Sequence, residues 1–189
     1  MQTTRTVEQA LFGTLALRRA LAVVAGALLV ALGAQAAVPL PGGVPMTLQV
    51  PAVLIVGGLL GPSLGATSLV IYLLMGVVGL PVFTPFGLPG IARLMGPTGG
   101  YLLAYPVAAA IAGLAAGAGR RWGRLALGLL AAFVVIHVGG VAQLAILGGD
   151  LGTAIRIGSL PFLIGDFAKL AFAGLIVGRF AVPVRRALH

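Results

Sequence analysis

The stretch ALAVVAGALLVALGAQAAV, residues 20–38, decides the class of this fold. It contains no Asp, Glu, Lys or Arg, and the uncharged sequence continues as far as Ala92. A second uncharged stretch runs from Leu94 to Gly119. Only 8% of the residues are charged, whereas soluble domains carry about a quarter. Apolar stretches of this length predict membrane-spanning helices, so we expect an all-α, polytopic membrane protein.

Outward from this stretch, proline, glycine and arginine divide the chain into apolar segments. Proline cannot continue a helix, so Pro39 and Pro41 end the first segment and Pro62 separates the second from the third. The six predicted spans are residues 20–38, 50–60, 64–80, 101–119, 125–147 and 161–180. We expect one membrane domain over residues 1–189, with a cytoplasmic segment 1–19, a transmembrane core 20–180 and a cytoplasmic tail 181–189.

The second segment is short for a span. About 14 residues at 1.5 Å each cover roughly 21 Å of a ~30 Å hydrocarbon core. An alternative therefore joins the second and third segments and leaves five spans. A further alternative treats the first segment as a secretory signal ending at Ala34-Gln35-Ala36. Because the rest of the chain is equally apolar, a first transmembrane helix is favoured over a signal.

The distribution of arginine favours six spans. With six, one side of the membrane holds nine arginines: Arg5, Arg18, Arg19, Arg120, Arg121, Arg124, Arg179, Arg185 and Arg186. The other side holds only Arg93 and Arg156. The positive-inside rule then predicts that both termini are cytoplasmic. The net charge of +9 reflects this topology, so we expect no nucleic-acid partner.

Few side chains are available for catalysis or for metal binding. The chain has no cysteine, three acidic residues and two histidines, which excludes disulfides and leaves a catalytic or metal centre without enough groups. It also lacks the phosphate-binding pattern GxxxxGK[ST], so any ATP hydrolysis requires another subunit. We expect no enzyme activity, no metal and no cofactor.

Asp166 and Lys169 are the most specific candidate site. They lie three residues apart inside the last segment, so they are neighbours on one helix face. Ionisable side chains inside a span are costly and usually face a cavity or a partner. One interpretation is an anion site; the alternative is an ion pair that only packs helices. His137, alone in the fifth segment, is more often a hydrogen-bonded packing residue than a ligand.

Three connections lie on the outer side: residues 39–49, 81–100 and 148–159. The first two are rich in Pro and Gly and poor in charge. Backbone of this kind is tolerated at membrane depth where it is buried in protein or lines a cavity. We therefore interpret both as packed lids over a pocket, although plain connecting loops remain an alternative. Polar side chains near them are Thr47, Gln49, Thr84, Thr98 and Tyr101.

Four motifs resemble those of one family, in order along the chain. They are PLPGGVPMTLQ (39–49), the set GPSLGA (61–66), YLLMG (72–76) and GLPVF (79–83), then GPTGGYL (96–102) and PFLIGDFAK (161–169). Together they resemble the BioY family, the biotin-binding S components of energy-coupling factor (ECF) importers. The resemblance implies a six-helix fold in a prokaryotic cytoplasmic membrane. It also implies biotin as ligand, and a transmembrane coupling protein with an ATPase pair as partners.

The resemblance also implies which residues form the sites. The expected ligand-binding residues are Asp166, Lys169, Gln49, Thr47, Tyr101 and Arg93. Arg93 belongs to a loop that is less glycine-rich than the family pattern. In S components the first helix presents small residues to the coupling protein, which here indicates Ala27 and Ala31. The alternatives are an S component or stand-alone carrier for another small vitamin or organic anion, and a membrane enzyme or structural subunit.

Overall fold

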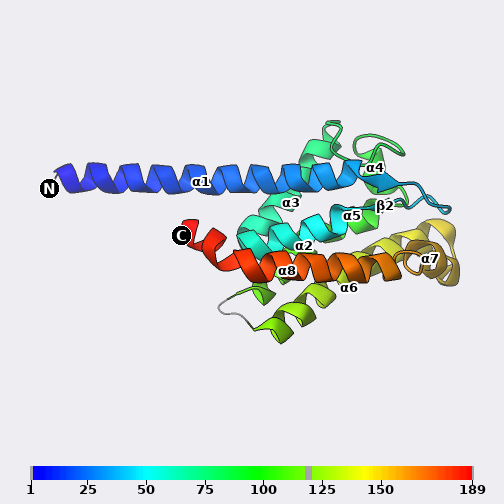
Figure 1. The fold of residues 1–189 in the computed structure, drawn as a ribbon. Coiled ribbons are helices and arrows are strands. Elements are labelled where there is room, and N and C mark those ends of the chain that lie inside the picture. Colours follow the sequence, from blue (N-terminus) through cyan, green and yellow to red (C-terminus); the bar gives the residue numbers. More distant parts are fainter. Residues whose placement is uncertain (1, 118–120, 189) are drawn as a thin grey trace.

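The computed structural model describes residues 2–117 and 121–188, with side chains from residue 13 onward. Arg120 lies outside the described residues, as does the side chain of Arg5. The predicted all-α fold is confirmed: the chain is mostly helical, with one two-stranded hairpin (Figure 1). The elements are α1 (Gln2–Gln35), β1 (Ala37–Val38), β2 (Met46–Thr47), α2 (Gln49–Leu60), α3 (Pro62–Val77), α4 (Ala92–Met95), α5 (Gly99–Ala115), α6 (Trp122–Gly148), α7 (Leu151–Gly158) and α8 (Leu163–Ala187).

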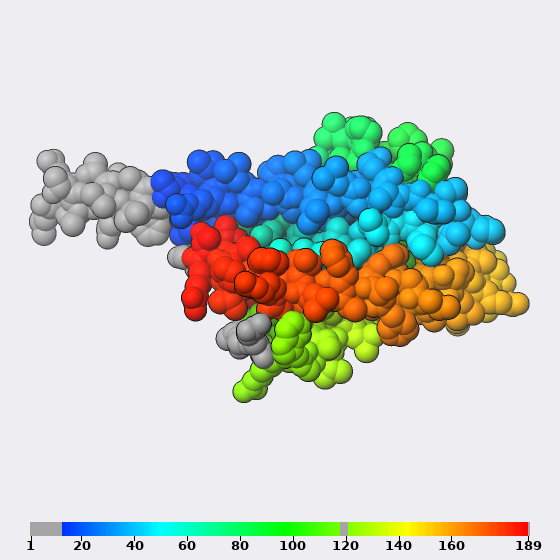
Figure 2. All heavy atoms as spheres, viewed as in Figure 1, coloured from blue at the N-terminus to red at the C-terminus, as the bar shows by residue number. Residues whose placement is uncertain are grey.

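Three helices of the described chain are long and apolar enough to cross a membrane. They are Gly13–Gln35 of α1, the whole of α6 and the whole of α8. Helices α2, α3 and α5 are apolar but shorter, at 12, 16 and 17 residues. Figure 2 shows α1 and α8 along one face of the molecule, with α2 between them. Large apolar side chains are exposed on the outer helices, including Leu28 and Leu32 of α1 and Ile164 and Phe167 of α8.

The chain reverses direction between α2 and α3. Gly61 adopts a φ of +89°, which favours glycine, and Pro62 opens the next helix. A Cβ atom placed on Gly65 would lie 2.8 Å from the Cα of Gly57. In one continuous helix these two residues would be about 12 Å apart along the axis. The second and third apolar segments are therefore two separate helices, and the alternative of one fused helix is wrong.

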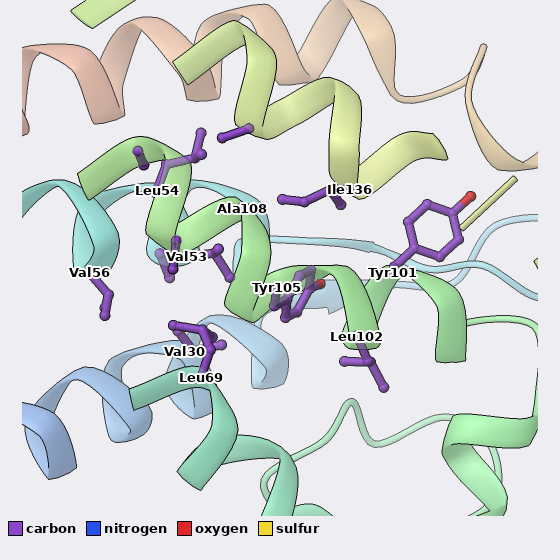
Figure 3. Packing of buried hydrophobic residues seen from close by; sticks show 14 of the residues in the cluster. Val30, Val53, Leu54, Val56, Leu69, Tyr101, Leu102, Tyr105, Ala108 and Ile136 are labelled. Carbon is purple, nitrogen blue, oxygen red and sulfur yellow. The ribbon is translucent and has the colours of Figure 1, made fainter. Parts of the chain in front are cut away.

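The buried core joins all the long helices. Figure 3 shows Val30 of α1, Val53 of α2 and Leu69 of α3 converging on α5, whose Tyr105 and Ala108 face them. Ile136 of α6 packs on the opposite side of α5 (Figure 3). Each of these side chains is buried. Helix α5 is therefore the centre of the bundle, and it carries Tyr101 at one end.

Arg185, near the end of α8, binds the ends of two other helices, α2 and α5. Arg185 of α8 donates from Nη2 to the carbonyl oxygens of Gly58 (2.7 Å) and Gly113 (2.9 Å), and from Nε to that of Leu59 (3.4 Å). The carbonyl of Gly58 lacks its usual helical donor, because Pro62 has no N–H. The N–H of Gly117, which would serve Gly113, donates to Leu114 instead. Arg185 thus satisfies carbonyls that the ends of α2 and α5 leave free.

The three connections that we expect on the outer side contain more regular structure than the sequence predicted. The first forms the β1–β2 hairpin, and the second contains α4. The third, expected to be a polar loop, contains α7, so that expectation is wrong. Asp150 caps α7 by accepting from the backbone N–H groups of Thr153 (2.7 Å) and Gly152 (3.3 Å). Hydrogen bonds from Thr153 and Gly152 hold the pKa of Asp150 below its ordinary value.

Candidate ligand site

A cavity lies where the β1–β2 hairpin and the second outer connection meet α5, α6 and α8. Its lining consists of Val44, Pro45, Thr47, Gln49, Val50, Phe83, Thr84, Arg93, Thr98, Tyr101, Leu102, Tyr105, His137, Phe162, Asp166 and Lys169. All six residues that the sequence analysis assigned to a ligand pocket are among them. The cavity measures about 50 Å³. Its walls combine a few charged and polar groups with apolar side chains, the usual composition of a small-molecule site.

Asp166 and Lys169 form the charged centre of the cavity. They lie on the first turns of α8, and Lys169 Nζ is 2.8 Å from Asp166 Oδ1. Asp166 is 2% exposed, so its carboxylate is surrounded by protein. Taking such charges out of water is costly unless they are paired and hydrogen-bonded. The predicted pairing of these residues on one helix face is thus present, and it points into a cavity.

Thr47 and Gln49 connect the hairpin to α2. The Thr47 hydroxyl accepts from the backbone N–H of Gln49 (3.2 Å) and lies 3.3 Å from its side-chain oxygen. The Gln49 amide nitrogen donates to the hydroxyl of Tyr72 at 2.7 Å. Gln49 and Tyr72 are both buried. These bonds fix the amide of Gln49 at the wall of the cavity, and Tyr72 is a supporting residue that the sequence analysis did not assign.

Tyr101 is fixed by a hydrogen bond of its hydroxyl and by packing of its ring. The hydroxyl donates to the carbonyl of Gly158, at the end of α7. The ring lies against Gly140 of α6, where an added Cβ would come within 2.0 Å of the ring. Tyr101 therefore ties α5 to α6 and α7, and it forms part of the cavity wall through its ring.

Arg93 is a buried cation whose hydrogen bonds hold residues 84–88 around its guanidinium. Its Nε donates to Leu88 O (2.9 Å), and its Nη atoms donate to the hydroxyl (2.9 Å) and carbonyl (2.8 Å) of Thr84 and to the carbonyl of Phe86. The side chain is 7% exposed. Burial lowers the pKa of Arg93 from its ordinary value, but a guanidinium keeps its charge in proteins. No acidic side chain pairs with it among the described residues.

His137 is the main cavity residue that the sequence analysis interpreted as packing. Its Nδ1 lies 3.1 Å from Ser159 Oγ, and its Nε2 lies 3.2 Å from Asp166 Oδ2. His137 and Asp166 are 29 positions apart on different helices. No local spacing rule connects such positions, so the only signal in the sequence was a histidine inside an apolar span.

Lys169 also borders a second space on the outside of the bundle. This groove lies between α1, α2 and α8, the three helices side by side in Figure 2. It measures about 520 Å³ and is lined by apolar side chains apart from Lys169: Leu29, Leu32, Gly33, Leu48, Pro51, Ala52, Ile55, Ala168 and Phe172. The stem of Lys169 therefore separates the polar cavity from an apolar surface.

The two alanines expected on a docking face of the first helix are buried in this structure. Ala27 is fully buried and Ala31 is 8% exposed, so both face the protein interior. Their small side chains allow α1 to pack closely against α2 and α3. A separate protein has no access to them in this arrangement. The side chains that α1 turns outward are instead larger ones such as Leu28 and Leu32.

Comparison with known proteins identifies the family. Residues 3–186 match the model of the BioY family. The probable biotin transporter BioY of Pyrococcus horikoshii is 44% identical over 151 residues, which are 80% of this chain and 88% of that protein. The biotin transporter BioY of Thermotoga maritima is 37% identical over 151 residues, with the same two shares of 80% and 88%.

The fold agrees with this assignment. A crystal structure of the S-component for biotin from an ECF-type ABC transporter superposes with a TM-score of 0.71 at 27% identity, and the match covers 95% of this chain and 93% of that one. The family model extends over residues 3–186 and so includes every residue of the cavity. The chain therefore belongs to the BioY family.

Proposed function

We propose that this protein binds biotin and delivers it across the membrane as the substrate-binding subunit of an ECF importer. The observation that carries the proposal is the cavity in which Asp166, Lys169 and Arg93 meet apolar walls, in a chain of the BioY family. The relatives named as biotin transporters and the solved S-component for biotin support biotin as the ligand.

The charges around the cavity suit a ligand with one negative charge. Arg93 and Lys169 are cations and Asp166 is an anion, so these three side chains carry a net charge of +1. The fourth ionisable side chain discussed here, His137, adds no charge when it is neutral. Lys169 already has a counter-ion in Asp166, whereas the acceptors of Arg93 among the described residues are all neutral. A buried charge is stabilised by a counter-ion. The carboxylate of biotin supplies one, and either cation is a candidate to receive it.

The remaining groups match the rest of biotin. Its ureido ring carries N–H donors and a carbonyl acceptor, which suit the carboxylate of Asp166 and the donors of Gln49. Its sulfur-containing ring and alkyl chain need apolar walls, which Phe83, Leu102 and Phe162 provide. A cavity of about 50 Å³ has room for only a few water molecules.

The membrane arrangement that we propose has six spans, with both termini in the cytoplasm of a prokaryote. Helices α1, α6 and α8 are candidate spans by length, and the arginines at the ends of the apolar segments support the orientation. The partners are a transmembrane coupling protein and a pair of ATPases, since this chain lacks a nucleotide-binding motif. The protein itself acts as a transporter subunit and not as an enzyme.

The test is a binding measurement on the purified protein. Radiolabelled biotin is added to the full chain in detergent or lipid nanodiscs, and unlabelled biotin, biotin amide and other small anionic vitamins compete with it. The proposal expects saturable binding with biotin as the best competitor. Preference for another vitamin or organic anion would contradict biotin as the substrate and would favour a carrier of a different specificity.

A further inference from the structure

His137 connects three elements at the cavity. It projects from α6 and lies between Ser159, the residue that ends α7, and Asp166 on the first turns of α8. Ser159 is itself fixed, because its N–H donates to Ile155 (3.0 Å) and its carbonyl accepts from Phe162 (3.1 Å). Ser159, His137, Asp166 and Lys169 thus form a continuous chain of hydrogen bonds along one wall of the cavity.

The proton positions in this chain follow from its end at Lys169. An ammonium group 2.8 Å from Asp166 keeps that carboxylate ionised, and an ionised carboxylate only accepts hydrogen bonds. Nε2 of His137 must therefore carry a proton and donate it to Oδ2 of Asp166. A hydroxyl both donates and accepts, so Ser159 is able to donate to Nδ1. This pattern corresponds to a neutral imidazole protonated at Nε2.

The ring of His137 has little freedom to turn. Phe133 lies on one side, with ring centroids 4.2 Å apart, and Tyr101 and Phe162 lie at 6.2 and 6.4 Å. The residue is 8% exposed. Aromatic walls and two hydrogen bonds together hold both ring nitrogens in place, so the direction of the Nε2–H is fixed toward Asp166.

We infer that His137, whose Nε2–H points at Asp166, is a positioning residue that presents Asp166 to the ligand as a hydrogen-bond acceptor. A carboxylate has about four acceptor positions. Lys169 and His137 take one on each oxygen, which leaves the remaining positions for N–H donors in the cavity. These positions suit the N–H groups of a cyclic urea such as the ureido ring of biotin. This inference rests on the proposed function for the identity of the ligand.

The neutral state of His137 belongs to the same inference. With a neutral imidazole, the charges of Arg93, Lys169 and Asp166 sum to +1, which one carboxylate balances. A protonated imidazole would raise the sum to +2 and leave one cation unbalanced after binding. The Ser159 hydroxyl is able to donate to Nδ1 of the neutral ring, so the hydrogen-bond chain is complete in this form.

Nitrogen NMR tests the tautomer directly. The chain contains only His137 and His189, so ¹⁵N-histidine labelling gives two ring signals, and His189→Gln identifies the one from His137. We expect the long-range ¹⁵N–¹H pattern of a neutral ring protonated at Nε2 at neutral pH, and a change of the Nδ1 shift in Ser159→Ala. A doubly protonated ring, or a ring protonated at Nδ1, would overturn the inference.

Binding of radiolabelled biotin tests the positioning role. In His137→Gln the amide nitrogen is able to replace Nε2 as donor to Asp166, whereas His137→Leu supplies no donor. We expect His137→Leu to bind biotin at least about tenfold more weakly, which is about 1.4 kcal/mol, and His137→Gln to recover part of the loss. Equal affinity of His137→Leu and the parent protein would overturn the positioning role alone. Absence of biotin binding by the parent protein would instead contradict the proposed function, while the NMR pattern would still report the tautomer.

Discussion

The ammonium nitrogen of Lys169 lies 2.8 Å from Oδ1 of Asp166, one turn earlier on α8, and His137 reaches the other oxygen of the same carboxylate. Asp166 therefore keeps one partner if either neighbour is removed. Lys169 has no second acidic group near it among the described residues. Of the two members of the pair, Lys169 is thus the more informative one to substitute.

Lys169→Ala is expected to weaken biotin binding strongly. The change removes a cation from the cavity and leaves Asp166 with His137 alone. Truncating one partner of a buried charged pair typically costs about 2–5 kcal/mol, which is roughly 30- to several-thousand-fold in affinity. Lys169→Arg should recover only part, because a planar guanidinium does not replace a compact ammonium. Competition binding measures both variants, and Ile164→Ala, on the exposed face of α8, is the matched control. Parent-like binding by Lys169→Ala would mean that the pair only packs the helix.

Arg93 is expected to act through both its charge and its loop contacts. Arg93→Met removes one cation and every hydrogen bond that holds residues 84–88 around the guanidinium. Thr84→Val removes a loop contact and leaves the charge in place. If the charge serves the ligand carboxylate, Arg93→Met should reduce the affinity for biotin at least tenfold more than that for uncharged biotin amide. Thr84→Val should reduce both alike. An equal loss for the two ligands in Arg93→Met would limit Arg93 to supporting the loop.

The parts of the site that the sequence predicted are local in the chain. Asp166 and Lys169 meet because residues three apart share a helix face, and Thr47 and Gln49 meet because one turn joins β2 to α2. The contact between His137 and Asp166 depends on how α6 packs on α8, and one sequence does not determine that packing. Helix α7 was missed because its eight residues are far below the length of a span, although Asp150 before them is a common helix cap.

The sequence alone also did not predict which side of α1 packs against the rest of the protein. Alanine and glycine occur on every side of this helix, so small residues alone do not show which side packs inward. The structure places Ala27 and Ala31 inside and Leu28 and Leu32 outside. In a membrane helix the lipid-facing side is as apolar as the buried side, so hydrophobic periodicity gives no answer.

Ala27→Leu is accordingly expected to disturb the fold and not a docking surface. Ala27 is fully buried, and extra methylene groups in a packed core typically cost about 1–3 kcal/mol. Ala25, two residues earlier, is exposed, so Ala25→Leu adds the same atoms without a clash. We expect Ala27→Leu to lower the thermal stability of the purified protein and to reduce biotin binding and uptake together. Loss of uptake with normal stability and binding would restore Ala27 as a contact for the coupling protein.

The proposed topology predicts opposite sides for α7 and for the end of α8. The protein lacks cysteine, so single substitutions give unambiguous labels. Leu151→Cys and Ala187→Cys place a thiol at exposed positions of these two helices. In intact cells, a membrane-impermeant maleimide should label the residue 151 variant, and the residue 187 variant should react only after the cells are opened. Labelling of both from the same side would contradict six spans with cytoplasmic termini.

Arg185 is expected to stabilise the bundle at the end opposite the cavity. Its guanidinium bonds the carbonyls of Gly58 and Gly113, which the helices themselves leave without donors. Arg185→Met keeps much of the side-chain length but leaves these carbonyls unsatisfied, and each buried unsatisfied group costs about 1–3 kcal/mol. Arg186→Met removes the same charge from an exposed neighbouring position and is the matched control. Thermal unfolding in detergent should therefore show a lower midpoint for Arg185→Met than for Arg186→Met.

Biotin affinity at low temperature should stay close to that of the parent in both variants, because Arg185 is not part of the cavity. Equal midpoints for the two variants would show that water satisfies the carbonyls of Gly58 and Gly113 as well as the guanidinium does.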